Sequence, residues 1–279
     1  METASLEKVA QKLRFEAVRM IYEGKDGHPG PALSIADIVA VLFFQEMNLD
    51  PKRPDWEDRD RFVLSKGHAC PVYYAALNER GYFQPKVEHF QLRQLGSIFQ
   101  GHPSMHSTPG VDMTSGSLGN GIAVAAGMAA AGRTQGKDFY VYCICGDGEL
   151  QEGQIWEAAM TAAQFSLDNV CAVVDDNGVQ LDGPTKDIMD VEPLGAKFAA
   201  FGWEVLDVDG HSLAALRDAF RIAAATQGRP TVLIAHTVKG KGVSFMEDVA
   251  GWHGKAPNDE EYKTAMDELK ARLAEVEGM

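Results

Sequence analysis

Two short polar segments of the sequence carry oxygen atoms that suit a divalent cation. Segment 146–148 (Gly-Asp-Gly) follows an apolar run, and segment 175–178 (Asp-Asp-Asn-Gly) follows the next one along the chain. Asn177 lies 30 residues after Asp147, the length of a strand-helix-strand unit, so both are expected at carboxyl ends of strands, where open α/β sheets bind ligands. Mg²⁺ takes one or two protein carboxylates together with phosphate oxygens and water, so the pair implies a diphosphate ligand.

Other nucleotide and metal motifs do not fit these segments. The dinucleotide fingerprint GxGxxG needs a glycine at position 151, which is Gln151, and GxxxxGK[ST] does not occur. A calcium loop needs Asp or Asn at position 179, where the chain has Val179. Either segment alone is as well explained by a turn, but the two at this spacing favour a binding site.

Alternating β-rich and helical segments predict an α/β fold, with a mostly parallel sheet and helices on both faces. Strands are expected at 62–64, 140–144, 170–174, 203–206 and 231–235. Helices are expected at 5–23, from Ser34 as N-cap to about residue 47, and at 122–132, 152–166 and 212–226. Because segment 122–132 is rich in Ala and Gly, another element is expected to pack closely against it. Residues 1–279 are interpreted as one domain, with 239–279 as a C-terminal extension that ends in a charged surface helix over 259–277.

Composition excludes several classes of protein. The 279 residues carry a net charge of −14, which opposes binding to nucleic acid or to anionic membranes. No apolar run approaches the roughly 20 residues that span a bilayer, and the N-terminus does not resemble a signal peptide, so a cytoplasmic location is expected. Among the four cysteines there is no CxxC pair, and Cys143 and Cys145 would face one side of a strand as reduced core residues.

Six motifs, in order along nearly the whole chain, resemble the N-terminal part of transketolase, with the span from Asp147 to Asn177 similar to the thiamine-diphosphate motif. They are 27–30 (GHPG), 65–69 (SKGHA), 101–103 (GHP), 116–121 (GSLGNG), 146–153 (GDGELQEG) and 239–242 (KGKG) leading to 252–254 (WHG). The resemblance implies the thiamine-diphosphate-binding fold over residues 1–279.

The resemblance also implies how the cofactor and its metal are held. It assigns Mg²⁺, with Ca²⁺ or Mn²⁺ as substitutes, to the side chains of Asp147 and Asn177 and to the backbone carbonyl of Val179. The other implied cofactor contacts are Gly148 and His68 against the diphosphate with Lys66 and Lys239 nearby, Gly116 and Leu118 at the aminopyrimidine ring, and His253. Two lysines suit a diphosphate because each is a flexible point charge.

Catalytic roles follow from the same resemblance. His28 and His253 are candidates to remove the proton of the ketose C3 hydroxyl, and His102 would bind the hydroxyls of the transferred two-carbon unit. An imidazole suits both tasks because it titrates near neutrality. Glu152 resembles the glutamate that points toward the subunit interface and helps couple two active sites, although alone it would be an ordinary acid of a first helical turn.

In this superfamily a second domain, which binds the pyrimidine, supplies a glutamate that activates the cofactor. In a full transketolase that domain is expected beyond residue 279, so the chain is interpreted as one subunit of a split transketolase. The expected assembly is an α2β2 heterotetramer with a separate pyrimidine-binding subunit. It would act on sugar phosphates, either in the pentose phosphate pathway or in a dedicated route for another sugar. One alternative is the α-like subunit of a split 2-oxo acid dehydrogenase, against which the histidine-rich channel and segment 252–254 argue. A non-catalytic relic is the other, and the intact metal ligands argue against it.

Overall fold

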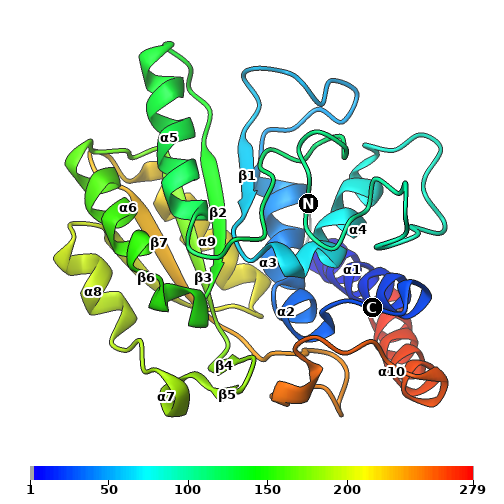
Figure 1. The fold of residues 1–279 in the computed structure, drawn as a ribbon. Coiled ribbons are helices and arrows are strands. Elements are labelled where there is room, and N and C mark those ends of the chain that lie inside the picture. The colour runs from blue at the N-terminus through cyan, green and yellow to red at the C-terminus, as the bar shows by residue number, and fades with distance from the viewer. Residues whose placement is uncertain (1–2, 279) are drawn as a thin grey trace.

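A five-stranded parallel sheet forms the centre of the protein, whose computed structural model describes residues 3–278. The strand order is β1-β2-β3-β7-β6, and every neighbouring pair is parallel. Figure 1 shows this sheet together with a small antiparallel ribbon, β4-β5, below it. The strands are β1 (Arg61–Leu64), β2 (Val141–Gly146), β3 (Val170–Asp176), β4 (Val179–Gln180), β5 (Gly183–Pro184), β6 (Glu204–Asp209) and β7 (Thr231–His236). The predicted α/β class is confirmed.

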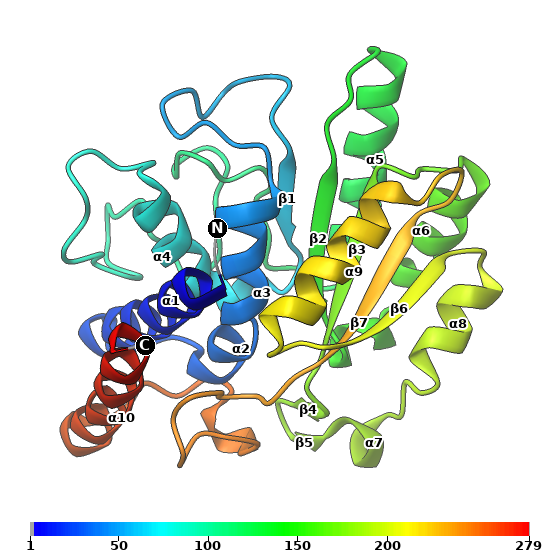
Figure 2. The same ribbon diagram turned by 180° about the vertical axis from the view of Figure 1, so that it is seen from behind.

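Helices cover both faces of the sheet. Figure 1 shows α5, α6 and α8 in front of it, and Figure 2, from behind, shows α9 across the other face with α1 to α4 beyond. The helices are α1 (Thr3–Gly24), α2 (Pro29–Ser34), α3 (Ala36–Val41), α4 (Cys70–Arg80), α5 (Gly121–Thr134), α6 (Gly153–Gln164), α7 (Thr185–Ile188), α8 (Leu194–Ala200), α9 (Leu213–Ala225) and α10 (Asp259–Glu277). Single turns occur at Leu42–Glu46, Gly67–Ala69, Gly148–Gln151 and Ala250–Trp252.

Side chains of the central strands alternate between two cores, as a pleated strand requires. Along β2, Val141, Cys143 and Cys145 face the core under α5, α6 and α8, whereas Tyr142 and Ile144 face the core under α9 and the N-terminal helices. The prediction for Cys143 and Cys145 is therefore confirmed: both are buried on one face, with their Sγ atoms 3.8 Å apart and no disulfide. Both faces of the sheet are covered at its centre, which explains why β2, β3 and β7 are largely apolar, whereas the edge strand β6 carries acidic residues and is only partly buried.

The predicted helix from Ser34 to about residue 47 is wrong at its start. The chain becomes helical at Pro29, whose ring suits a first helical turn, and α2 ends at Ser34. Ser34 is the last residue of α2 and so does not cap the following helix; its hydroxyl donates to the Asp175 carboxylate, 2.8 Å away. Helix α3 then starts at Ala36 and passes into a π-helical turn, Leu42–Glu46. Helix α4 was not predicted, since burial on nearly all sides leaves it no polar face.

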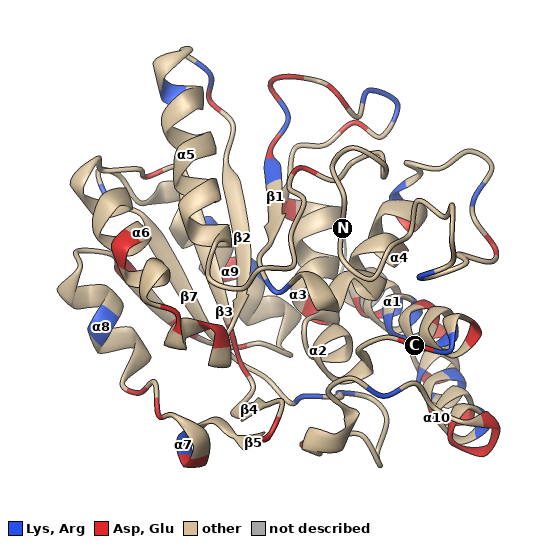
Figure 3. Cartoon of the chain, viewed as in Figure 1, with Lys and Arg blue, Asp and Glu red and all other residues tan. Residues whose placement is uncertain are grey.

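Residues 239–278 pack against the N-terminal helices. Helix α10 begins at Asn258, whose side chain and that of Glu261 form a reciprocal capping box. Charged residues of both signs are distributed along α10 (Figure 3), while Met266 and Leu269 are buried in a third apolar cluster with Val18 of α1. The predicted charged helix over 259–277 is thus present and docked on α1. No helix among the described residues is both long and apolar enough to cross a membrane.

Candidate active site

The two polar segments meet at the carboxyl edge of the sheet, at the bottom of Figure 1. Strands β2 and β3 are adjacent and parallel, and Gly146 lies opposite Asp175 in their register. Asp147 comes directly after β2 and Asn177 comes directly after β3, so the two residues lie at neighbouring strand ends. The two turns are joined directly, because the amide of Gly178 donates to Asp147 Oδ2 over 2.8 Å. The strand-helix-strand spacing inferred from the sequence is confirmed.

A cavity of about 480 Å³ opens at this edge, and every residue that the sequence predicts for the site lines it. They come from distant loops and are His28, Lys66, His68, His102, Gly116, Leu118, Asp147, Gly148, Glu152, Asn177, Val179, Lys239 and His253. The structure thus brings the whole predicted set together, although their individual roles stay predictions. Seven further residues complete the lining: Pro31, Gly146, Glu149, Gln151, Gln180, Leu181 and Asp182.

Asp147 is a buried carboxylate that forms no ion pair with any Lys, Arg or His of residues 3–278. It accepts hydrogen bonds from the amides of Gly148 and Gly178 and from the hydroxyl of Thr185, all of them neutral donors. Burial, followed by the nearby negative charge of Asp175, raises the pKa of Asp147 to about 6. Buried charges in proteins are normally paired or bound to metal, so this carboxylate fits a cation site.

The other two predicted metal donors offer oxygen atoms beside it. Asn177 is held by its amide nitrogen, which donates to Asp175 Oδ2 over 2.7 Å. The carbonyl of Val179 accepts from the Lys239 ammonium, 2.5 Å away, so a positive group already lies at this oxygen. The described residues contain no cluster of three or more His, Cys, Asp or Glu side chains suited to a metal. The proposed donors are instead one carboxylate, one amide and one carbonyl, a hard oxygen set that fits Mg²⁺.

The two lysines of the site differ in what they can offer a ligand. Lys66 is 2% exposed, and its ammonium donates to Asp175 Oδ2 at 2.6 Å, to the Pro31 carbonyl at 2.9 Å and to Ser34 Oγ at 3.4 Å. An ammonium has three protons, so these acceptors account for all of them. Lys239 contacts Val179 and His253, and burial, followed by the charge of Lys66, lowers its pKa to about 8. Lys239 is therefore the lysine available to an anion.

Three histidines from separate segments contact one another inside the cavity. The ring centroids of His28 and His68 are 5.1 Å apart, those of His68 and His253 are 5.1 Å apart, and those of His28 and His253 are 5.6 Å apart. Burial is the main cause that lowers the pKa of each, to about 4 for His28 and about 3 for His253, and nearby cations add to it. All three rings are thus neutral at pH 7. The acceptor nitrogen of His253 is Nδ1, which lies 2.9 Å from the Lys239 ammonium and accepts from it, because an ammonium can only donate.

The remaining predicted residues form the outer rim. A Cβ atom on Gly116 would lie 3.3 Å from the ring of His102, so this glycine allows the close approach of the 101–103 turn. Leu118 is 39% exposed toward the cavity mouth. Glu152 is exposed at the start of α6, and its side chain lies against Gly119. Backbone and apolar side chains are therefore accessible on this side of the cavity.

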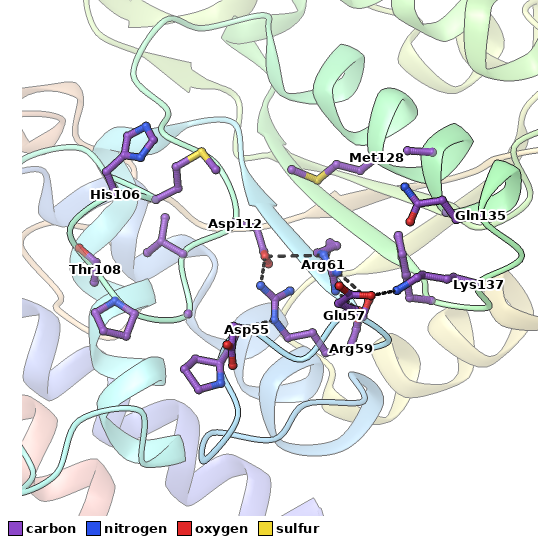
Figure 4. A pocket seen from close by; sticks show the side chains of 18 of the residues that line it. Asp55, Glu57, Arg59, Arg61, His106, Thr108, Asp112, Met128, Gln135 and Lys137 are labelled. Atoms are coloured by element: carbon purple, nitrogen blue, oxygen red, sulfur yellow. Dashed lines mark hydrogen bonds and ion pairs between the residues drawn. The ribbon is translucent and has the colours of Figure 1, made fainter.

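A larger cavity, of about 730 Å³, lies at the opposite end of β1 and contains none of the predicted residues. Figure 4 shows that its cations are already paired: Arg59 and Arg61 with Asp112, and Lys137 with Glu57. It is lined by the start of β1 and by the loop before β2, the amino edge of the sheet. With its cations paired, and with no cluster of metal-ligating side chains found in the part of the chain that the structure describes, it is not the candidate site.

Two buried carboxylates of the site were not predicted from the sequence. Glu149 accepts hydrogen bonds from Ser65 and from the amides of Gly119 and Gly146. Asp175 accepts from Lys66, Ser34 and other neighbours. Glu149 directly follows segment 146–148 and Asp175 begins segment 175–178, so their position beside Asp147 and Asn177 in the sequence was the available signal.

Comparisons with known proteins agree with this geometry. The family model described as "Transketolase, thiamine diphosphate binding domain" matches residues 5–273. The chain belongs to the transketolase family. This confirms the resemblance, and with it the interpretation of the chain as part of a transferase; the domain description supports thiamine diphosphate as the cofactor.

Relatives in the transketolase family are of two lengths. An apulose-4-phosphate transketolase subunit of Phocaeicola vulgatus is 39% identical over 277 residues, 99% of this chain and 98% of that protein. "6-deoxy-6-sulfo-D-fructose transketolase subunit SqwG" of a Clostridium species is 44% identical, covering 88% of each. The transketolase of Pongo abelii is 41% identical over 90% of this chain but only 40% of its own length. The word "subunit" in the first two names is consistent with the predicted partner.

Solved transketolases share the fold. The crystal structure of transketolase from Campylobacter jejuni matches 99% of this chain with a TM-score of 0.89 at 32% identity. Transketolase from Leishmania mexicana matches the same share with a TM-score of 0.86. The chain spans about half of each, 46%, so it corresponds to the thiamine-diphosphate-binding part of those longer chains.

Proposed function

We propose that the chain is the diphosphate- and magnesium-binding subunit of a two-chain transketolase. In this proposal it transfers a two-carbon ketol unit from a ketose phosphate to an aldose phosphate, together with a separate subunit that binds the pyrimidine. The observation that carries the proposal is the meeting of Asp147, Asn177 and Val179 in one cavity with four histidines. Relatives of nearly equal length whose names include "subunit" support the division into two chains.

The diphosphate end of the cavity is built for an anion and its metal. Asp147, Asn177 and the Val179 carbonyl would hold Mg²⁺, or Ca²⁺ or Mn²⁺ in its place. Gly148 leaves room for phosphate oxygens at the backbone, and the Lys239 ammonium adds a positive charge at the same point. Lys66 acts on this end indirectly, since its charge neutralises Asp175 beneath Asn177.

In the same cavity, His28, His102 and His253 serve the substrate. Thiamine diphosphate, when bound, supplies the carbon nucleophile that takes up the two-carbon unit. His28 and His253 are neutral and are the candidates to accept the proton of a substrate hydroxyl as the carbon–carbon bond breaks. For His253 this requires Nδ1 to leave the Lys239 ammonium, from which it accepts in this structure. His102, at the rim, binds the hydroxyls of the two-carbon unit. Gly116 and Leu118 support the cofactor ring, and Glu152 faces the subunit boundary from the start of α6.

Reconstitution tests this assignment. The purified chain with Mg²⁺ and thiamine diphosphate should transfer no ketol unit from a panel of ketose phosphates and sulfosugars, and adding the pyrimidine-domain subunit should restore transfer. Activity of the chain alone would contradict the two-chain proposal. Turnover of pyruvate or branched 2-oxo acids by the pair would favour the dehydrogenase alternative, and failure of the pair to bind the cofactor would favour a relic. The α2β2 assembly and the cytoplasmic location stay predictions.

A matched pair of variants tests the metal site. Asp147→Asn removes the carboxylate charge, so Mg²⁺-dependent binding of thiamine diphosphate should weaken by at least about 100-fold, comparable to the larger effects seen when metal sites are disturbed. Asp182→Asn changes a carboxylate that lines the same cavity but is exposed, and it should bind the cofactor as the unmodified chain does. Equal binding by both variants would contradict the assignment of Asp147.

A further inference from the structure

A buried network behind the cavity joins three elements that do not line it. Both terminal nitrogens of the Arg14 guanidinium, on α1, donate to the two carboxylate oxygens of Asp37, on α3. His211, in the loop between β6 and α9, lies with Nδ1 2.7 Å from Asp37 Oδ2. Arg14 and Asp37 are both buried, so the network forms a fixed support in the protein interior.

The hydrogen bonds of His211 define its tautomer. The backbone amide of Val238 donates to His211 Nε2 over 2.8 Å. Because an amide can only donate, Nε2 carries no proton, and Nδ1 carries the proton that it donates to Asp37. Burial alone would raise the pKa of Asp37, but the Arg14 guanidinium and the hydrogen bond from His211 outweigh it and lower that pKa. The ring is therefore held on both sides.

Val238 directly precedes Lys239, the lysine available to an anion in the cavity. The chain leaves β7 at His236, and the amides of Thr237 and Gly240 then donate to the backbone carbonyls of Asp176 and Gly30, each over 3.1 Å. The amide of Val238 is held instead by a side chain. Substitution of that side chain is thus the direct way to release this part of the segment.

The loop that carries His211 is pressed against the same segment. The amide of Gly210 donates to the His236 carbonyl over 2.9 Å. A Cβ atom on Gly210 would overlap Thr237 Cγ2, so only glycine permits this contact without a shift. The position of His211 relative to Val238 is therefore set by backbone packing as well as by its own hydrogen bonds.

We propose that His211 is a positioning residue that acts through the backbone of Val238 to place the Lys239 ammonium at the cavity. Asp37 and Arg14 serve it by orienting the ring. The Lys239 ammonium lies 2.5 Å from the Val179 carbonyl and 2.9 Å from His253 Nδ1, so a shift of the 238–239 backbone would displace it from both. The consequence for cofactor binding rests on the proposed function, whereas the consequence for the Val238 amide does not.

Two substitutions separate the two hydrogen bonds of His211. In His211→Gln, the side-chain oxygen reaches the place of Nε2 and can still accept from Val238, but the bond to Asp37 is lost. In His211→Asn, the shorter amide reaches Asp37 only. Hydrogen exchange of the Val238 amide should accelerate about tenfold in His211→Asn and remain nearly unchanged in His211→Gln, since a net hydrogen bond corresponds to roughly one factor of ten. Equal exchange in the two variants would overturn the proposal.

A double-mutant cycle tests whether His211 acts through Lys239. Binding of thiamine diphosphate with Mg²⁺ should weaken about 5- to 10-fold in His211→Asn. In the background of Lys239→Gln, the same change should have no further effect, because the group it positions is gone. Additive losses would overturn the proposal, as would a global loss of exchange protection in both His211 variants. These binding measurements use the chain together with its pyrimidine-domain subunit. If that unmodified pair binds no cofactor while the Val238 amide still responds, the proposed function fails and the positioning role stands.

Discussion

The amide of Gly119 donates to the carboxylate of Glu149 over 2.8 Å, which ties the loop before α5 to the loop after β2. The same carboxylate accepts from the amide of Gly146 and from the hydroxyl of Ser65, which in turn accepts from the amide of Gly121. One buried side chain thus connects three loops around the cavity. The aminopyrimidine contacts proposed for Gly116 and Leu118 depend on where this carboxylate holds the 116–121 loop.

Glu149→Gln should therefore destabilise the chain and weaken cofactor binding. The new amide group cannot accept a hydrogen bond and would face one of the present donors, leaving a buried donor unsatisfied at a cost of about 1–3 kcal/mol. Urea unfolding measures the loss of stability. Glu157→Gln, on the exposed side of α6, is the control and should leave the midpoint unchanged. An unchanged midpoint in Glu149→Gln would contradict the role of this carboxylate.

Lys66→Met should be among the most damaging single substitutions in the site. The Lys66 ammonium lies 2.6 Å from Asp175 Oδ2, and both side chains are buried, so the variant leaves an uncompensated charge in the interior. Breaking such a pair costs about 3–5 kcal/mol. The double variant Lys66→Met/Asp175→Asn removes the charge as well, so it should lose less stability than the sum of the two single variants. Strict additivity in urea unfolding would show that the pair is not coupled.

The site was predictable because its ligand-type residues occupy short motifs that directly follow apolar runs. A parallel sheet brings such positions to one edge, so Asp147 and Asn177 could be placed together from spacing alone. The histidines come from separate loops, and their presence in the cavity followed from the family resemblance. No local pattern in the sequence brings the loops that carry His28, His68 and His253 to one point.

What could not be predicted depends on partners far apart in the sequence. Ser34 has the residue type of a helix cap, yet its hydroxyl serves Asp175, 141 residues away. Glu149 pairs with Ser65 across 84 residues, and Asp37 pairs with His211 across 174. A helix-cap prediction weighs only neighbours within a turn, so a tertiary partner such as Asp175 is invisible to it.

Two glycines of α5 should respond in opposite ways to alanine. A Cβ atom on Gly121 would overlap Ser65 Cβ, so Gly121→Ala must displace Ser65 and its bond to Glu149, at a cost of about 1–3 kcal/mol. Gly127 has open space at this position, so Gly127→Ala should stabilise the helix by about 0.5–1 kcal/mol. Urea unfolding of the isolated chain compares the two. Changes of the same sign would contradict the close packing inferred for the Ser65 loop.

The stability of the chain should fall as the pH drops from about 6.5 toward 4, partly because of His28. Burial, followed by the charge of Arg93, lowers the pKa of His28 from 6.5 to about 4 in the folded state, so the unfolded chain binds this proton more readily in that window. The contribution of His28 is therefore complete above pH 6.5 and lost as the pH falls through its folded-state pKa. Thermal midpoints at several pH values should decline less steeply in His28→Asn than in the unmodified chain.

Arg93→Met removes a nearby cation and should raise the pKa of His28, measured by NMR titration of its ring protons. A His28 resonance that titrates near pH 6.5 in the folded chain would contradict both expectations.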